Sequence, residues 1–458
     1  MSATFGILPF AALQFDKHGR LTTPEEAEAL EALVREQGIT DLFVAAHGWQ
    51  NDAGTAFGLY QRLFTNLSRI LAQRPAHGRK AAVAGIFWPS KPRYQDYGSF
   101  TRARRPGAGG AASAGGAQDD VEAVRARLED FKAFFEDDPD AAAAIAAIDE
   151  AAALADRLGE EAAQDRFVAL LRSAVTPEPS APDEDRTDRL VDEGLPGREL
   201  LARLRQPTLQ VARRPEGSGG AMSVPSFAAP PGGGAGGAAG LFQSIGGAAQ
   251  KLVDQFTYSE MNERAGVVGL GLARILAELR RKPPGLRVHL VGHSFGARLV
   301  TSAAGAPDRL GPSSLTLLQA AFSHHAFSAS YKKSGKPGFF RPVVGAVRGP
   351  IVITHTANDD AVGVAYPIAS KLAGQEAASI GGPDSLFGAL GRNGAVDTLE
   401  AIAGEMRDAA GAYALDRTPG RIYNLRADEF IRDREGLEAH GDVTNADVAN
   451  VVAGAAGF

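Results

Sequence analysis

The sequence predicts an α/β protein: a mostly parallel, eight-stranded sheet covered by helices on both faces and interrupted by a large helical insertion. Two observations support this fold class. Short, continuous apolar runs alternate with amphipathic runs in both terminal parts of the chain, as expected for parallel strands that are buried on both faces. The alternation stops between residues 96 and 254, where the composition changes to acidic and alanine-rich.

The N-terminal part contributes four of the expected strands and two helices. The apolar runs predict strands at residues 4–10, 12–15, 41–46 and 81–88. Helical periodicity predicts helices at residues 24–37 and 55–71. The third strand leads directly into a His-Gly pair, so it ends in a turn.

Residues 96–254 are interpreted as an insertion into a core formed by residues 1–95 and 255–458. The insertion holds 17 Lys and Arg against 26 Asp and Glu, a net charge of −9 in a chain whose total is −6. Apolar stripes predict three helices, at residues 121–135, 145–158 and 167–175. Two Gly/Ala/Pro-rich tethers, at 106–117 and 215–240, offer little to bury and are expected to be flexible.

The α/β alternation resumes in the C-terminal part. A helix is predicted at residues 261–280, followed by strands at 286–291, 314–321, 350–355 and 421–425. The count is therefore eight strands, and the fifth runs into the segment Gly-His-Ser-Phe-Gly.

Composition excludes several classes of function. The chain has no cysteine, which removes disulfides and thiolate chemistry. There is no basic stripe, so nucleic acid is not an expected partner. No metal is expected because no His-Glu-x-x-His spacing occurs, and no nucleotide cofactor because the Gly-rich stretches lack a phosphate-binding Lys-Ser/Thr ending. No apolar run approaches 18 residues, and no basic residue precedes the N-terminal apolar stretch, so a cytoplasmic protein without a transmembrane segment is expected.

Ser294 is the candidate nucleophile. It stands in Gly292-His293-Ser294-Phe295-Gly296, between an apolar strand and a helix. A serine on such a sharp turn is held in a strained conformation with its hydroxyl lifted clear of the sheet. The residues two positions away on either side must be small, and both are glycine.

The nucleophile needs a base and a carboxylate that orients it. Loops at the carboxyl ends of parallel strands converge on one crevice, so these groups should follow later strands. Asp359, shortly after the strand at 350–355, is the preferred acid, and the adjacent Asp360 is the alternative.

His440 is the candidate base, since it lies in a glycine-containing loop after the last strand. The other histidines fit less well. His324 and His325 precede the acid in sequence, His355 ends a strand, and the side chain of His293 should turn away within its tight turn.

The fourth expected part is an oxyanion hole. Its first donor would be the backbone N–H of Phe295, the residue after the nucleophile. The second should come from the loop after the third strand, where His47-Gly48 permits a tight bend and Trp49 can offer an N–H.

The order His-Gly, Ser, Asp, His resembles the serine esterase and lipase-like branch of the α/β-hydrolase superfamily. The segments His-Gly-Trp-x-Asn-Asp from residue 47 and Phe-Trp-Pro-Ser from residue 87 resemble a group of bacterial serine hydrolases. The resemblance covers residues 1–95 and 255–458 and implies an α/β-hydrolase fold. It also implies Ser294 as nucleophile, His440 as general base, Asp359 as orienting acid, and Trp49 with Phe295 as oxyanion donors. Lids in this superfamily usually follow the sixth strand, whereas the insertion here follows the fourth.

The expected activity is hydrolysis of a small-molecule or lipid-like carboxylic ester. Amide or thioester cleavage and acyl transfer would use the same residues, and a non-catalytic partner-binding protein is the alternative from another class. Arg264 is expected either to reach an acidic group near the site, such as Asp52, or to form an ion pair on a helix surface.

Overall fold

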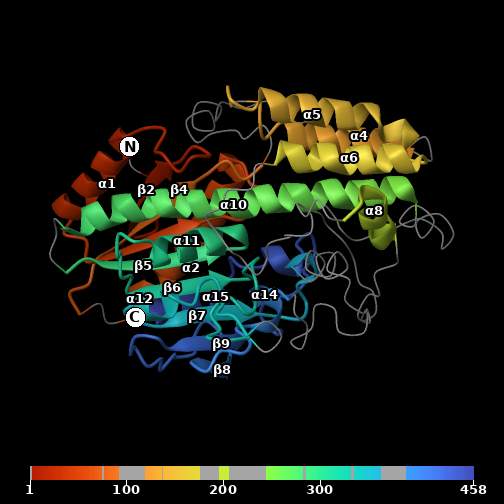
Figure 1. Cartoon of the computed structure of the whole chain (residues 1–458). Helices are drawn as coiled ribbons and strands as arrows, with labels where there is room; N and C mark the ends of the chain where they lie inside the picture. The colour runs from red at the N-terminus through yellow and green to blue at the C-terminus, as the bar shows by residue number, and fades with distance from the viewer. Residues whose placement is uncertain are drawn as a thin grey trace.

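The sheet of nine strands forms the centre of the molecule in a computed structural model (Figure 1). The model describes residues 3–74, 77–91, 119–136, 138–175, 195–205, 244–281, 285–331, 335–362 and 388–458. Both expected tethers, at 106–117 and 215–240, lie outside the described residues. The strand order is β1-β2-β4-β3-β5-β6-β7-β9-β8.

All neighbouring strands run parallel except β1 and β2, which pair antiparallel. The strands are β1 (Thr4–Phe5), β2 (Leu8–Gln14), β3 (Asp41–Ala46), β4 (Ala81–Phe87), β5 (Arg287–His293), β6 (Ser314–Leu318), β7 (Ile351–His355), β8 (Ala401–Glu405) and β9 (Ile422–Arg426). The predicted α/β class and mostly parallel sheet are confirmed.

The predicted strand set needs two corrections. The chain turns at Gly6, which has a φ of 63°, so the first strand stops at Phe5 and the second begins at Leu8. The ninth strand, β8, was not predicted. It lies at the edge of the sheet, several of its residues face solvent, and it therefore lacks the continuous apolar run of a buried strand.

Helices cover both faces of the sheet because alternate residues of each buried strand point to opposite sides. In β3, Leu42, Val44 and Ala46 join one apolar cluster, and Phe43 and Ala45 join the other. The first cluster includes side chains from α1 (Glu25–Glu36), α10 (Ile245–Arg281) and α11 (Phe295–Gly305), and the second includes side chains from α2 (Ala53–Ala72) and α15 (Ala446–Ala456).

Helix α10 links the core to the insertion. Its C-terminal half packs on α11, and its N-terminal half packs on the insertion helices (Figure 1). Close packing requires glycine here: a Cβ on Gly269 would lie 2.3 Å from the Leu299 carbonyl oxygen, and one on Gly271 would lie 1.9 Å from the Gly19 carbonyl oxygen. The helix begins at Ile245 and not at residue 261 as predicted, so the expected boundary at 254/255 falls inside one continuous helix.

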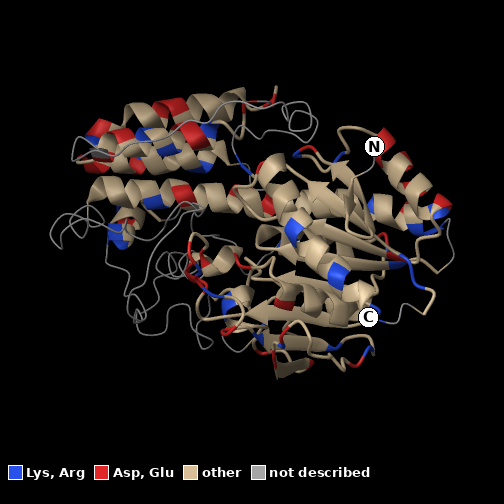
Figure 2. Ribbon diagram, turned by 180° about the vertical axis from the view of Figure 1, so that it is seen from behind, with Lys and Arg blue, Asp and Glu red and all other residues tan. Residues whose placement is uncertain are grey.

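The described part of the insertion consists of α4 (Asp119–Lys132), α5 (Ala142–Ala153), the 3-10 turn η1 (Ala155–Arg157), α6 (Glu161–Ala174) and α8 (Gly197–Arg205). Acidic and basic residues are interspersed along these helices (Figure 2). Exposed ion pairs join each helix to the next, with N···O distances of 2.9 Å for Lys132–Asp149, 2.7 Å for Arg166–Glu150 and 2.7 Å for Arg198–Asp165. Such pairs contribute little individually, so the buried apolar stripes hold the helices together.

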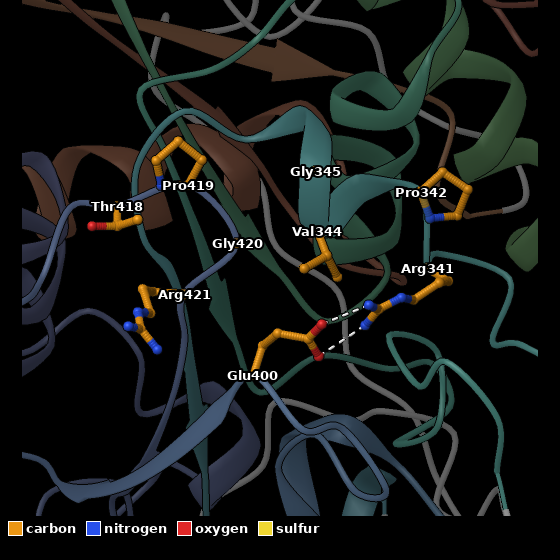
Figure 3. Close-up of a pocket in the computed structure, with 9 residues that line it drawn as sticks. All are labelled: Arg341, Pro342, Val344, Gly345, Glu400, Thr418, Pro419, Gly420 and Arg421. Carbon is orange, nitrogen blue, oxygen red and sulfur yellow. Dashed lines mark hydrogen bonds and ion pairs between the residues drawn. The ribbon is translucent and has the colours of Figure 1, made fainter.

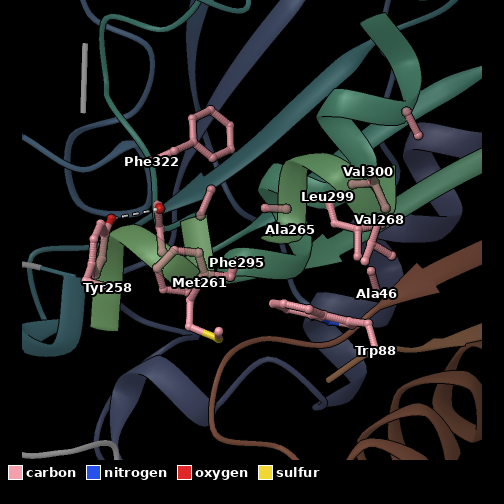
Figure 4. Packing of buried hydrophobic residues seen from close by; sticks show 14 of the residues in the cluster. Ala46, Trp88, Tyr258, Met261, Ala265, Val268, Phe295, Leu299, Val300 and Phe322 are labelled. Carbon is pink, nitrogen blue, oxygen red and sulfur yellow. Dashed lines mark hydrogen bonds between the residues drawn. The ribbon is translucent and has the colours of Figure 1, made fainter. Parts of the chain in front are cut away.

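The strand order reverses beside β3. The chain passes from β3 to β4 on one side, whereas β5 on the other side of β3 leads away to β6. A crevice outside the carboxyl ends of two such strands is the usual ligand site of an open α/β sheet. Around this point Trp88, Met261 and Phe295 pack together in the core (Figure 4). Among the described helices, none has a stretch long and apolar enough to cross a membrane.

Candidate functional site

Ser294 occupies the turn between β5 and α11. Its φ is 57° and its ψ is −124°, a conformation that a non-glycine residue rarely adopts. Two backbone bonds hold it there: the Ser294 N–H donates to the Leu318 carbonyl at 3.1 Å, and the Ala321 N–H donates to the Ser294 carbonyl at 3.3 Å. Strain of this kind persists only where the surroundings enforce it, and it is often found at functional sites.

Three glycines allow the chain to close around this serine. A Cβ on Gly292 would lie 2.4 Å from the Ala297 Cα, and one on Gly296 would lie 2.2 Å from the Ala46 carbonyl oxygen. A Cβ on Gly48 would lie 2.6 Å from the Ser294 Cβ and 3.2 Å from its Oγ. The loop after β3 therefore passes directly over the serine, as the pairing of Ala46 with Gly292 requires.

The loop after β3 is fixed by β4. His47 is fully buried; its Nε2 accepts from the Trp88 N–H at 3.4 Å, and its carbonyl accepts from the Trp88 indole at 3.0 Å. Since Nε2 is the acceptor, Nδ1 carries the proton and donates to the Gly48 carbonyl at 2.9 Å. Burial lowers the pKa of His47 to about 4, so the ring is neutral near pH 7.

Asn51 and Asp52 complete this loop. The Asn51 amide donates to the Gly48 and Trp49 carbonyls at 3.0 and 2.9 Å, and Asp52 caps α2 through the Thr55 N–H at 2.9 Å. Within the described part of the chain, the backbone N–H groups of Trp49 and Phe295 donate to no protein acceptor. Phe295 directly follows Ser294, and Trp49 directly follows Gly48, which lies against Ser294. The two N–H groups that the sequence suggested as oxyanion donors are therefore both close to the Ser294 turn.

Asp359 and His440 come together from loops after β7 and β9. His440 lies in the 3-10 turn η3 (Ala439–Gly441), and its Nδ1 bonds the Asp359 Oδ2 at 2.8 Å. Burial disfavours the charged form of both His440 and Asp359. The interaction between the two groups outweighs this effect of burial, so the pKa of His440 is raised and that of Asp359 is lowered. An ionised Asp359 therefore stabilises a protonated His440.

The neighbouring carboxyl group, Asp360, does not share this geometry. Its side chain is 86% exposed and lies 3.7 Å from the Arg392 Nη1, whereas Asp359 is fully buried. Two further donors reach Asp359: the Gln319 amide at 3.1 Å on Oδ2 and the Val362 N–H at 3.2 Å on Oδ1.

His293 does not turn away from the site, contrary to the sequence-based expectation. Its ring lies 4.8 Å from that of His440, centroid to centroid, and its Nε2 bonds the His440 carbonyl at 2.8 Å. Because a carbonyl can only accept, Nε2 carries the proton. Burial and the nearby His440 lower the pKa of His293 to about 3, so it is a neutral support for the loop that carries His440.

The remaining candidates lie elsewhere. His324 and His325 are buried in the loop after β6, where His324 Nδ1 contacts the Asn393 amide at 3.0 Å. His355 ends β7, as expected. Arg264 does not reach Asp52, which pairs with Lys91 at 2.8 Å. It forms the expected helix ion pair, with Glu260 at 2.9 Å, but it is buried and also donates to the Pro89 carbonyl at 3.1 Å.

Sequence reasoning missed two residues that shape the site, Gln319 and Asn51. A single buried glutamine after a strand carries no motif. Asn51 lies inside the His-Gly-Trp-x-Asn-Asp segment, and its position three residues after the glycine could have indicated a side chain that binds the loop's own carbonyls.

A second hydrogen-bonded Ser, His and Asp group lies at the opposite edge of the sheet. His289 Nδ1 bonds the Ser314 Oγ at 2.8 Å, and His289 Nε2 bonds the Asp41 Oδ1 at 3.0 Å. All three are buried at the amino ends of β3, β5 and β6. We call Ser294, His440 and Asp359 the carboxyl-edge set, and Ser314, His289 and Asp41 the amino-edge set.

A hollow of about 720 Å³ also lies at the amino edge (Figure 3). Arg341, in the loop before α12 (Val343–Ala346), forms a bidentate ion pair across it with Glu400, at 2.8 and 2.5 Å. The pair neutralises both charges, and none of the sequence-predicted site residues lines this hollow. Among the described residues, no group of three or more His, Asp or Glu side chains is arranged to hold a metal ion.

Comparison with protein-family models, curated protein sequences and solved structures gives no match to this chain.

Proposed function

We propose that the chain is a serine hydrolase with an α/β-hydrolase fold, which cleaves a carboxylic ester through an acyl-enzyme intermediate. The observation that carries this proposal is the strained Ser294, placed under the Gly48 loop at the same edge of the sheet as the Asp359–His440 pair. The resemblance of the sequence motifs to this superfamily points the same way.

Each residue has one role in the proposed reaction. The Ser294 Oγ attacks the ester carbonyl while its proton passes to the His440 Nε2, and the ionised Asp359 stabilises the resulting imidazolium. The backbone N–H groups of Trp49 and Phe295 bind the oxyanion. His440 then gives the proton to the leaving alcohol. In the second half of the reaction water, activated by His440, attacks the acyl-enzyme, and His440 returns the proton to the Ser294 Oγ as the acid is released.

One contact of this mechanism is not formed in the free protein: within the described residues, no hydrogen bond joins the Ser294 Oγ to His440. Such bonds are often long in an enzyme without substrate and tighten when substrate binds. The neutral ring of His293, which holds the His440 carbonyl at 2.8 Å, limits how far the base can move.

Labelling with a fluorophosphonate probe tests the proposal, alongside turnover of a chain-length series of aryl esters. The wild-type protein should be labelled at Ser294 and should hydrolyse at least part of the series. Ser294→Ala should lose both, and the matched variant Ser314→Ala should lose neither. Labelling that survives Ser294→Ala would show that Ser294 is not the nucleophile.

A further inference from the structure

Gln319 lies between the two halves of the carboxyl-edge set. It is the first residue after β6, its side chain is fully buried, and its φ is 45°. A left-handed conformation is uncommon outside glycine, so the fold keeps a glutamine here against a local backbone preference. The contacts of this side chain and of the adjoining backbone explain why a glutamine occupies this position.

The backbone on either side of Gln319 holds the nucleophile. The preceding carbonyl, of Leu318, accepts from the Ser294 N–H, and the N–H two residues later, of Ala321, donates to the Ser294 carbonyl. The left-handed residue turns the chain so that both groups face the same serine. The conformation of Gln319 is therefore coupled to the strained conformation of Ser294.

The side chain of Gln319 holds the acid. Its Nε2 donates to the Asp359 Oδ2 at 3.1 Å and to the Gly391 carbonyl at 2.9 Å, and its Oε1 accepts from the Thr354 Oγ1 at 3.0 Å. These partners fix the orientation of the amide, because the nitrogen faces two acceptors and the oxygen faces a hydroxyl donor. The same Oδ2 accepts the His440 Nδ1–H.

We propose that Gln319 is a positioning residue that joins the Ser294 turn to the Asp359–His440 pair and fixes the two halves of the site relative to each other. This inference rests on the proposed function. The amide is suited to the role because it is neutral: it orients the carboxylate without a positive charge that would compete with the imidazolium for it. A carboxyl group in its place would repel Asp359.

Gln319→Met and Gln319→Glu test this role, with Gln255→Met as the matched control. Gln255 is another fully buried glutamine, on α10 outside the site. Gln319→Met should lower kcat by about 10- to 100-fold with little change in KM, since the loss affects the alignment of reacting groups and not ground-state binding. Gln319→Glu should lower kcat further, and Gln255→Met should leave kcat unchanged.

Two readouts separate positioning from general loss of stability. The pH at which kcat falls on the acid side should move downward in Gln319→Met, because a less well held carboxylate supports the protonated His440 less. The low-field proton resonance of the His440 Nδ1–H should shift or broaden in the same variant and stay in place in Gln255→Met. A folded Gln319→Met with wild-type kcat, pH profile and resonance would overturn the proposal.

The proposal remains testable if Gln319→Met does not fold or if Ser294→Ala remains active. If Gln319→Met does not fold, Thr354→Val takes its place, because it removes the hydroxyl that fixes the Gln319 amide. Smaller changes in kcat, in the pH profile and in the His440 resonance are then expected. If none of these changes occurs, the proposal is overturned. If Ser294→Ala retains activity, the proposed function fails. The resonance of His440 then still tests whether Gln319 orients the acid and base, and an unchanged resonance overturns that role.

Discussion

The two edges of the sheet present the same three kinds of side chain in different settings. In the amino-edge set, Asp41 also bonds Arg79 and Arg287, and these with His289 lower its pKa well below the usual range despite burial. Burial lowers the pKa of His289, so this ring stays neutral near pH 7. Asp41 favours a protonated ring, but burial together with the positive charges of Arg79 and Arg417 outweighs its effect on the pKa of His289.

In the carboxyl-edge set the pKa of the histidine is shifted in the opposite direction. Among the described residues, the side chains that bond the Asp359 carboxylate are His440 and the neutral Gln319, while Arg392 donates to the Asp359 backbone carbonyl, and the pKa of His440 is raised. The serines differ as well: Ser294 is strained in a turn, whereas Ser314 begins an ordinary strand. We therefore expect a Ser–His–Asp hydrogen-bond chain alone not to make Ser314 reactive, because the pKa of its histidine is lowered and its serine lies in an ordinary strand.

Replacing each histidine should separate the sets most clearly. His440→Ala should reduce kcat by about 10⁴-fold or more, because the members of a triad act as a unit. His289→Asn should leave kcat of the folded protein unchanged and lower its melting temperature. Steady-state kinetics and thermal denaturation measure both, and a large kcat loss in His289→Asn would break the comparison.

The two adjacent carboxyl groups give the next largest effect. Asp359→Asn should lower kcat by about 10³- to 10⁴-fold, since the amide favours the wrong tautomer of His440. Asp360→Asn, at the exposed neighbour, should have little effect. If Asp360→Asn is the more damaging of the two in ester-hydrolysis assays, the acid has been assigned to the wrong residue.

Removing the carboxylate of the amino-edge set should affect folding and not chemistry. Asp41→Asn leaves Arg79 and Arg287 without their partner and should lower the free energy of unfolding by about 3–5 kcal/mol in urea titrations. Because the pKa of Asp41 is lowered in the folded state, its stabilising effect is present above about pH 4 and is lost as the pH falls further. Wild-type stability in Asp41→Asn would contradict the charge balance described above.

The acid limb of the pH profile of kcat should follow the protonation of His440 and of no other histidine. In the proposed mechanism neutral His440 is the base, and its raised pKa is expected to place the midpoint of the acid limb above about 6.5. Asp359→Asn should move that midpoint downward in its residual activity, whereas His289→Asn should not move it. A wild-type midpoint below 6 would show that Asp359 does not stabilise the imidazolium.

The smallest effect is expected for the serine of the amino-edge set. Ser314→Ala removes one buried hydrogen bond to His289 and should cost about 0.5–1.5 kcal/mol of unfolding free energy. Denaturant titration measures this change. Fluorophosphonate labelling of Ser314→Ala should match that of the wild type. Reduced labelling would mean that the two edges of the sheet are coupled.

Much of the fold follows from the sequence because buried parallel strands are continuous apolar runs. That pattern located β3, β4, β5, β6, β7 and β9, although the run at 314–321 continues past the end of β6 at Leu318. It failed for β8, whose exposed residues have no such run, and for the first turns of α10, where Gly246 and Gly247 follow a Gly/Ala-rich segment.

The site was less predictable than the fold. A turn between two glycines indicates its own geometry, so Ser294 could be found from local sequence. Asp359 and His440 could be placed only by their order along the chain, and the structure brings them within 2.8 Å. The contacts of His293 and Gln319 could not be predicted, because their partners lie 147 and 40 positions away in sequence.

The position of the insertion has a consequence for how the chain is made. β3 lies between β4 and β5, but about 200 residues separate β4 from β5, so at ribosomal rates of roughly 5–20 residues per second the later strand emerges about 10–40 s after the earlier one. During that interval one side of β3 has no partner strand, and an unpaired apolar edge promotes aggregation. Nascent chains stalled between residues 90 and 280 should therefore be those most dependent on chaperones.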